Sequence, residues 1–345
     1  MDRREFLRIA AIASLSPLAA CVSGDPDTAS QHQPSPAESP VATPVESPSE
    51  SAPALGWRRI GAEGPGARRD YSFAAAGMGS TAFLFGGRAG GEPLGDLWRF
   101  EDDAWRQVSA EGPAPRFGHN SALIGERLFV FGGQGGQGLF FNDLWAFDAA
   151  PESWRQLGEG GPSPRYGAGG TALETTLTIS HGFTDAGRFD DTWSFSKEWS
   201  DVSPASGPRP IERCLHRLVY VNELNRLVLF GGQTNGVPFL DDTWLYDPAA
   251  KTWTEVTGPT PPPRNLYAAG ATRSALYVFG GNGNDGELRD LWSFDGESWS
   301  ELSQGKPRPG ARGGIDFASL GGRMLLFGGS DASGELSDLW ELTAP

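Results

Sequence analysis

Residues 127–157 read RLFVFGGQGGQGLFFNDLWAFDAAPESWRQL, and this stretch decides the fold because the chain repeats its plan six times. In each copy an apolar strand ends in a glycine pair, at intervals of 46 to 50 residues. The six endings are Phe85-Gly86-Gly87, Phe131-Gly132-Gly133, Ser180-His181-Gly182, Phe230-Gly231-Gly232, Phe279-Gly280-Gly281 and Phe327-Gly328-Gly329. Only the third copy replaces the first glycine, with His181. A period of about 50 residues is typical of one blade of a β-propeller.

Each repeat continues with two tryptophan signatures and then an arginine. The first signature is an Asp-x-Trp motif, at Asp96, Asp143, Asp191, Asp242, Asp290 and Asp338. A short W-x-x-apolar run follows in the first five repeats, and a Pro-rich turn leads to Arg68, Arg116, Arg165, Arg213, Arg264 or Arg312. Short apolar runs bounded by Gly and Pro predict four strands per unit. No stretch after residue 57 has a sustained helical period.

The sixth repeat ends without its fourth strand, and a spare run lies ahead of the first repeat. That run is Trp57-Arg58-Arg59-Ile60, which has the W-x-x-apolar pattern. Pairing it with the last repeat would close a ring of six sheets and remove most open sheet edges. With these motifs, residues 57–345 resemble the kelch repeat family. The resemblance implies an all-β, six-bladed kelch-type β-propeller, closed by the N-terminal strand 57–60 in the last blade.

The first residues resemble a bacterial export signal. Arg3 and Arg4 precede Phe-Leu, as in twin-arginine signals, and an apolar run of about twelve residues follows, too short to span a bilayer. The run ends in Leu-Ala-Ala-Cys, which resembles a lipobox and implies cleavage after residue 20 and acylation of Cys21. We therefore expect a signal peptide at 1–20 and a lipid-anchored chain on the extracytoplasmic side of a bacterial membrane.

Residues 21–56 predict a tether. After Cys21 the segment is rich in Ser, Pro and Glu, and it has five acids and no Lys or Arg before residue 56. Such a composition cannot bury enough apolar surface to fold. Apart from Cys21, the chain has one other cysteine, Cys214, so no disulfide is expected within the propeller.

The formal net charge of the chain is −15, and most of it falls within the propeller. A surface with this sign opposes nucleic-acid binding, which needs Lys and Arg to replace counterions. We expect no nucleic-acid partner, and membrane contact only through the lipid. We also expect a monomer.

The repeated arginines and aspartates predict a structural brace. In a four-stranded meander the start of the first strand and the start of the third lie at the same end of the sheet. The glycine pair on the strand between them would leave the path open. We expect Arg–Asp pairs within the blades, Arg116–Asp143, Arg165–Asp191 and Arg264–Asp290 among them, rather than a basic ring for an anion, because a ligand site seldom needs six copies.

Binding is expected where the blades differ, in the loops after the glycine pairs, because loops on a rigid scaffold commonly carry function. These loops are residues 88–95, 134–142, 183–190, 233–241, 282–289 and 330–337. Their candidate ligand-binding residues are Arg88, Gln134, Phe140, Phe141, Phe183, Gln233, Phe239, Asn282 and Ser330. Aromatic side chains beside amides suit a peptide or a sugar. The alternative is that the loops are Gly-rich connectors whose Phe residues pack on neighbouring blades.

Catalytic and metal sites have weaker support. Some kelch-like propellers are sugar-acid epimerases, and Glu212, Arg213 and His216 are the matching catalytic candidates here. Whether His119, His181 and His216 converge on a metal stays open, and we expect neither a metal nor a cofactor. The sequence therefore favours a binding module for an envelope protein, peptide or glycan. The alternative is a carbohydrate-active enzyme that uses the propeller channel.

Overall fold

The computed structural model describes residues 55–75, 79–158 and 160–343. The chain divides into residues 1–50 and residues 51–345, and every described residue belongs to the second unit. The predicted signal peptide, the twin arginine, Cys21 and nearly all of the predicted tether lie outside the described residues. Within the described residues, no helix has the length and apolar character needed to cross a membrane.

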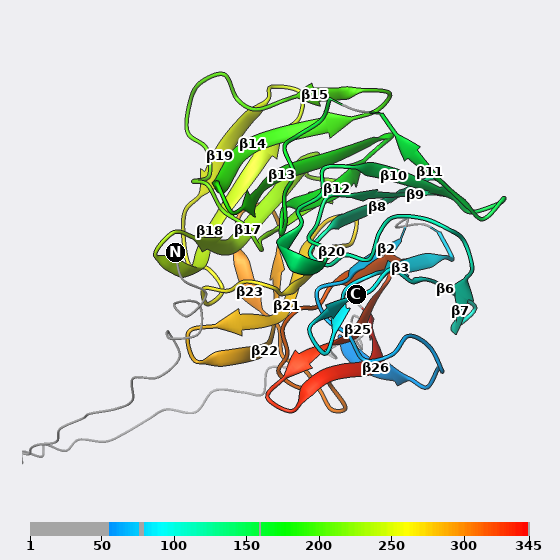
Figure 1. Cartoon of the computed structure of the whole chain (residues 1–345). Helices are drawn as coiled ribbons and strands as arrows, with labels where there is room; N and C mark the ends of the chain where they lie inside the picture. Colours follow the sequence, from blue (N-terminus) through cyan, green and yellow to red (C-terminus); the bar gives the residue numbers. More distant parts are fainter. Residues whose placement is uncertain (1–54, 76–78, 159, 344–345) are drawn as a thin grey trace, which may run out of the picture. The chain divides into compact units, whose positions relative to one another are not determined.

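Six four-stranded antiparallel sheets follow one another around a common centre (Figure 1). Blade 1 consists of β2 (Ser72–Ala75), β3 (Ala82–Phe85), β6 (Leu97–Glu101) and β7 (Ala104–Val108). Blade 2 consists of β8 (Asn120–Ile124), β9 (Arg127–Phe131), β10 (Leu144–Asp148) and β11 (Ser153–Leu157). Blade 3 consists of β12 (Gly169–Leu173), β13 (Thr176–Thr184), β14 (Gly187–Phe195) and β15 (Trp199–Asp201).

Blades 4 and 5 keep the same strand order, and blade 6 takes its fourth strand from the start of the propeller. Blade 4 consists of β16 (Arg217–Val221), β17 (Arg226–Thr234), β18 (Val237–Asp247) and β19 (Thr252–Val256). Blade 5 consists of β20 (Ala268–Ala271), β21 (Leu276–Gly283), β22 (Gly286–Phe294) and β23 (Trp299–Glu301). Blade 6 consists of β24 (Phe317–Leu320), β25 (Arg323–Asp331), β26 (Gly334–Thr343) and β1 (Gly56–Ile60). A two-stranded hairpin of β4 (Arg88–Ala89) and β5 (Glu92–Pro93) and a 3-10 turn, η1 (Gly136–Gly138), complete the described elements.

The ring closes as the sequence predicts. Trp57 pairs with Leu342 and Ile60 pairs with Leu339, so β1 is the outer strand of blade 6. The innermost strand of each blade contacts that of the next, and β24 contacts β2. The prediction of a six-bladed all-β propeller closed by residues 57–60 is confirmed.

The core lies between neighbouring blades rather than inside one. Phe83 of blade 1 meets Phe147 of blade 2 edge to face at 5.6 Å, and Phe230 of blade 4 meets Trp299 of blade 5 at 4.9 Å. Each sheet is thus covered by its neighbour on either side, which buries apolar faces that one four-stranded sheet would leave exposed. The blades form one cooperative body on which surface loops can be held rigidly.

The glycine pairs have a second physical role besides the one expected. Their backbone is left-handed, with φ of 67° at Gly132 and 96° at Gly133, a region that favours glycine. A Cβ at Gly132 would lie 2.9 Å from the carbonyl oxygen of Arg165 in the next blade. The glycines therefore permit a bulge and a close approach between blades, rather than only leaving a path for arginine.

Beyond the glycine pair, blades 3 to 6 resume strand pairing. In blade 3, Gly182 pairs with Phe189 and Thr184 with Gly187, after a register shift between Ser180 and Gly182. Segments 183–190, 233–241, 282–289 and 330–337, treated as loops in the sequence analysis, are largely the ends of β-hairpins. The hairpins extend the scaffold on one side of the propeller, here called the loop face.

Candidate functional site: the loop face

Each blade holds the loop face in place through its Arg–Asp brace. Arg116 is fully buried, and its two terminal nitrogens donate to Asp143 Oδ1 at 2.6 Å and Oδ2 at 2.9 Å. The same guanidinium donates to the carbonyl oxygen of Gly132, and its Nε donates to that of Ala114. A bidentate ion pair with all these acceptors positions the guanidinium firmly.

The brace is present in all six blades. Paired terminal nitrogens reach both carboxylate oxygens in Arg68–Asp96, Arg116–Asp143, Arg165–Asp191, Arg213–Asp242, Arg264–Asp290 and Arg312–Asp338. In blade 3, Arg165 donates to the carbonyl oxygen of His181 where the other blades have a glycine carbonyl. The change from Gly to His does not remove this acceptor, because it belongs to the backbone. Six equivalent pairs engaged within the fold leave no basic ring for an anion among these arginines.

The Asp-x-Trp motif is explained by a third hydrogen bond. In blade 2 the indole of Trp145 donates from Nε1 to Asp143 Oδ2 at 2.7 Å, and every blade repeats this bond. Burial opposes ionisation of Asp143, but the hydrogen bonds and charge of Arg116 and the Trp145 bond outweigh it and lower the pKa of the carboxyl. The aspartates are thus held as carboxylates.

The backbone of each brace arginine also joins two blades. Arg116 N donates to Leu94 O at 2.8 Å, and Gly87 N donates to Arg116 O at 2.9 Å, both in blade 1. The side chain of the same residue binds Asp143 in blade 2. The arginine is consequently a link between neighbours as well as a brace, a role that a pattern within one repeat does not reveal.

Two residues after each brace arginine, a backbone ring surrounds the centre of the propeller. The amides and carbonyls of Asp70, Gly118, Gly167, Leu215, Leu266 and Gly314 form a closed cycle of six hydrogen bonds of 2.7–3.3 Å. All six residues have φ between 52° and 67°. At this depth the channel wall is mostly backbone, and its one acid, Asp70, accepts a hydrogen bond from Arg88 Nε at 2.6 Å. The wall offers few side chains for catalysis.

The residues expected to begin the binding loops form a second layer next to this ring. Six of them pair through their backbones with the residue that follows a brace arginine: Arg88, Gln134, Phe183, Gln233, Asn282 and Ser330. All six are half-buried. The structure therefore places these candidates together around the centre of the loop face, as a mixed set that differs from blade to blade.

The aromatic candidates lie mostly as the alternative interpretation expects, with Phe residues packed against the scaffold or a neighbouring blade. Phe140 and Phe141 are both half-buried. The Phe141 ring lies 4.1 Å from the Arg116 guanidinium carbon, a cation–π contact with the brace. Phe140 meets Phe183 of blade 3 edge to face at 6.0 Å, and Phe239 is half-buried. Phe141 thus belongs to the scaffold, and the Phe140–Phe183 pair joins two hairpins.

The exposed apolar residues of the loop face are others, which the sequence analysis did not select. Leu139, Ile211 and Val237 have exposed fractions of 58%, 53% and 42%. They lie after η1, in the linker before Arg213 and at the β17–β18 turn. A lone aliphatic residue in a Gly- or Pro-rich turn is the sequence signal that would have found them.

The catalytic candidates are not assembled as an active site. Arg213 is the blade 4 brace, and its side chain bonds to Asp242, Gly231 O and Ile211 O. Glu212 is exposed and accepts a hydrogen bond from Asn235 Nδ2 at 3.4 Å. The structure therefore gives the epimerase-like alternative no support.

The three histidines are buried and only two of them meet. His181 and His216 lie with ring centroids 5.3 Å apart, whereas His119 shares a hydrogen bond with Ser72 Oγ at 2.7 Å. Burial, followed by the charges of nearby arginines, lowers the pKa of His119 and of His181 to about 3. Within the part of the chain that the structure describes, no three His, Cys, Asp or Glu side chains are placed to hold a metal ion.

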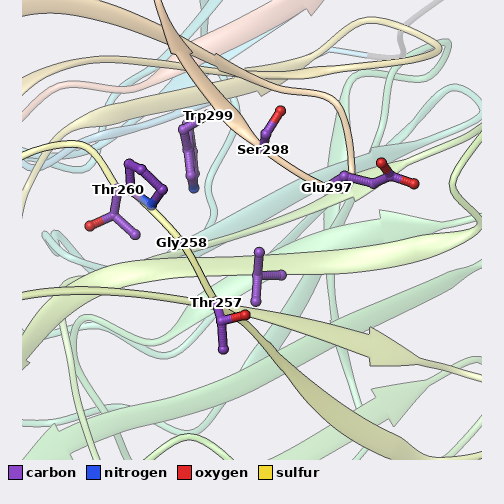
Figure 2. Close-up of a pocket in the computed structure, with 8 residues that line it drawn as sticks. Thr257, Gly258, Thr260, Glu297, Ser298 and Trp299 are labelled. Atoms are coloured by element: carbon purple, nitrogen blue, oxygen red, sulfur yellow. The ribbon is translucent and has the colours of Figure 1, made fainter.

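One small pocket lies away from the centre, between blades 4 and 5. Its volume is about 150 Å³, and Figure 2 shows the labelled lining residues on two segments, Thr257 to Thr260 and Glu297 to Trp299. It carries one acid, Glu297, and no basic or sulfur side chain among its lining residues. Its place at the blade seam separates it from the residues expected to bind a ligand.

The fold, the glycine bulge, the brace and its tryptophan define a kelch-type propeller. The family model described as the KLHDC2/KLHL20/DRC7 Kelch-repeats domain matches residues 53–232 and 224–344. The chain belongs to this kelch-repeat family, whose propellers are typically protein-interaction modules.

Curated relatives match over parts of their length. An F-box/kelch-repeat protein of Arabidopsis thaliana is 30% identical over 50% of this chain and 41% of its own length. Adagio protein 3 of the same plant is 28% identical over 72% of this chain and 36% of its own. The flagellar outer-arm dynein alpha chain of Chlamydomonas reinhardtii is 26% identical over 55% of this chain and 3% of its own. The chain thus spans well under half the length of these relatives.

Proposed function

We propose that this protein is a binding module that takes a protein partner of the cell envelope on its loop face, and that it is held to a bacterial membrane by lipid on Cys21. The single observation that carries the binding role is the arrangement of the loop face. The same brace in every blade supports a layer of residues that differ between neighbouring blades.

The contrast between the two layers favours binding over a purely structural role. The brace repeats the same Arg–Asp pair in all six blades, as expected for residues that stabilise the fold. The layer above it contains Arg88, Gln134, Phe183, Gln233, Asn282 and Ser330, and no two neighbouring blades repeat a residue there. A rigid frame with variable residues is the usual design of a recognition surface.

The start of the propeller suits a tethered module. Gly56 pairs with Thr343, at the end of β26 that is remote from Asp338 and the loop face. A tether joined to Gly56 would therefore attach on the opposite side of the propeller. This arrangement leaves the loop face open to a partner when Cys21 is acylated.

Site-specific photo-crosslinking in the host cell tests the binding role. A photoreactive residue replaces exposed Asn284, at the β21–β22 turn on the loop face, or exposed Ala150, at the β10–β11 turn on the opposite face. We expect a discrete adduct with a protein at position 284 and none at 150. Equal adducts at both positions, or none at several loop-face positions, would contradict the proposal.

A further inference from the structure

The chain contains two Asn-Gly pairs, and the fold places them in different surroundings. Asn235 and Gly236 form the two-residue turn between β17 and β18, and both are exposed. Asn282 and Gly283 lie within β21, where they are paired with β22. Asparagine is a labile residue, and a following glycine has no Cβ to keep its amide nitrogen away from the asparagine side chain. The two pairs therefore offer a comparison within one molecule.

Two charged side chains from other segments hold the side-chain amide of Asn235. Arg188, near the start of β14 in blade 3, donates from Nη1 to Asn235 Oδ1. Asn235 Nδ2 donates to Glu212 Oε1, in the linker before β16, at 3.4 Å. A guanidinium only donates and a carboxylate only accepts, so both contacts specify the same orientation of the amide. Its oxygen faces a positive charge and its nitrogen faces a negative one.

The guanidinium of Arg188 is the better fixed of these two groups. Arg188 and Phe183 are cross-strand neighbours in blade 3, and the guanidinium carbon lies 5.2 Å from the centre of the Phe183 ring. A cation over an aromatic face is held there electrostatically. Arg188 is half-buried, whereas Asn235 and Glu212 are exposed. Water can therefore reach the amide while the guanidinium keeps its orientation.

The backbone nitrogen of Gly236 is the nucleophile that the sequence places next to this amide. Thr234 pairs with Val237 across the turn, so Gly236 lies outside the strand ladder. Within the part of the chain that the structure describes, the Gly236 nitrogen donates no hydrogen bond. Gly283, by contrast, is a paired residue of β21. Attack by Gly236 on Asn235 is intramolecular, and holding reactants together in this way removes much of the entropic cost of reaction.

We propose that Asn235 is a site of self-catalysed deamidation, in which Arg188 and Glu212 assist attack by the Gly236 nitrogen. A bond forms between this nitrogen and Asn235 Cγ, and the proton of the nitrogen passes to water. The π electron pair of the side-chain carbonyl moves to Oδ1, where Arg188 stabilises the negative charge. The pair returns as the Cγ–Nδ2 bond breaks. Glu212 relays a proton from water to Nδ2, which leaves as ammonia.

Water then opens the cyclic imide at either of its carbonyls, so the net reaction consumes one water and releases one ammonia. One opening leaves an aspartate at position 235, and the other leaves an isoaspartate, which adds a methylene to the main chain of the turn. Either product sets a carboxylate against Arg188 as an ion pair and against Glu212 as a like charge. The reaction thus changes the charge and shape of a hairpin tip on the loop face, and the inference does not depend on the proposed binding function.

Peptide mapping by mass spectrometry of the aged, full-length chain tests this inference. Deamidation is followed at both Asn-Gly pairs, in the folded chain and in the chain unfolded by guanidinium chloride. We expect the two pairs to react at similar rates when unfolded. In the folded chain Asn282 should be preserved, and Asn235 should react about tenfold faster than when unfolded, a smaller gain than buried oxyanion donors supply because this site is exposed.

Single variants separate the assisting groups from the labile pair itself. Arg188→Gln and Glu212→Gln should each slow the reaction of Asn235 in the folded chain and leave its rate in the unfolded chain unchanged. Glu287→Gln removes the same charge from an exposed position of the blade 5 hairpin and is the matched control. It should leave the folded rate of Asn235 unchanged. Thermal unfolding of each variant checks that the propeller is intact.

Three results would overturn the inference. Asn235 that reacts no faster folded than unfolded would show that the surrounding side chains give no assistance. Faster reaction in Arg188→Gln would show that the guanidinium protects the amide instead of activating it. Equal slowing by Glu212→Gln and Glu287→Gln would reduce the effect of Glu212 to net charge. None of these measurements uses the crosslink at position 284, so the loop-face binding function is tested separately.

Discussion

At the scale of single residues, the brace arginine has the most demanding position in the molecule. Arg116 is fully buried, and its charge is compensated by a carboxylate, two carbonyl oxygens and the face of an aromatic ring. A buried charge that loses its partner is strongly destabilising, even where the intact pair adds little by itself. The brace therefore makes the fold sensitive to loss of either member.

Asp143→Asn tests the brace in blade 2. The change keeps the side-chain shape but leaves the buried guanidinium of Arg116 without a negative partner, and we expect the free energy of unfolding to fall by about 3–5 kcal/mol. Denaturant unfolding followed by tryptophan fluorescence measures it. Asp148→Asn, at the end of the strand that follows Asp143, removes a more exposed ion pair with Arg127 and should cost about 0–1 kcal/mol. Equal effects of the two variants would refute the role of the brace.

The buried histidines predict an acid sensitivity with a defined range. The folded-state pKa of His181 is about 3, well below the value of about 6.5 for a free imidazole. Between these values the unfolded chain binds a proton that the folded chain does not, so stability falls as the pH is lowered from 6.5. The brace aspartates also have lowered pKa values, so the stability that their carboxylates contribute is lost mainly below pH 3.8, the ordinary aspartate pKa.

His181→Gly tests the contribution of one buried histidine to this acid sensitivity. Glycine occupies the equivalent position in the other five blades and suits the φ of 60° found at His181. We expect the free energy of unfolding of the variant to fall less steeply between pH 6.5 and pH 4.5, because up to one proton fewer is taken up on unfolding. Denaturant titrations across that range measure the slope, and an unchanged slope would show that His181 does not titrate as inferred.

At the scale of elements, β1 is held in its sheet by a strand that is distant from it in the sequence. It pairs with β26 from the other end of the chain. Trp57 lies between blades 5 and 6, where its ring meets Phe279 at 5.0 Å and Phe317 at 6.2 Å, and its Nε1 donates to Gln304 Oε1. The strand therefore seals both a sheet edge and a seam between blades.

Trp57→Ala should weaken this seam. Loss of a buried tryptophan removes apolar burial and leaves a cavity, which costs about 3–5 kcal/mol. Hydrogen exchange should rise first in β1 and β26, since their pairing loses its packed side chain. Arg59→Ala on the same strand changes an exposed residue and is the control. A loss of stability confined to blades far from this seam would contradict the closing role of β1.

The hairpins that carry the proposed site also belong to this scale. Their register shifts at the glycine pair and then pairing resumes, so the variable residues lie on strand ends rather than on free loops. Blade 2 is different, because η1 replaces the extended hairpin and exposes Leu139. One blade with a distinct connection gives the loop face an asymmetry that six equal hairpins would lack.

At the scale of the whole molecule, the two sides of the propeller suit different tasks. The described chain begins at the side opposite the braces, and the loop face lies on the side that carries them. An anchor upstream of residue 55 would therefore hold one side and present the other. This division is the basis for combining a lipid anchor with a loop-face partner in one proposal.

Cys21→Ala tests the anchor. We expect wild-type protein made in the host to sediment with membranes and to incorporate labelled fatty acid. The variant should incorporate none and should not be retained by membranes, because stable anchoring needs the acyl chains. Lysine replacement of both Arg3 and Arg4 should block export and keep the precursor intact. Membrane retention of Cys21→Ala would rule out the lipid anchor, and the folded propeller provides an internal control for stability.

Sequence alone determined the six blades, their closure and the partners within each brace. These features depend on residues less than about 50 positions apart, or on one spare strand matching one vacancy, so a repeated pattern is enough to specify them. The tertiary structure alone decided the environment of the loop face. Phe141 lies against Arg116, while Leu139, Ile211 and Val237 stay exposed, because exposure there depends on the path of a turn and on contacts from the next blade. Such contacts follow no period along the chain, and for that reason these exposed residues could be recognised only once the blades were packed together.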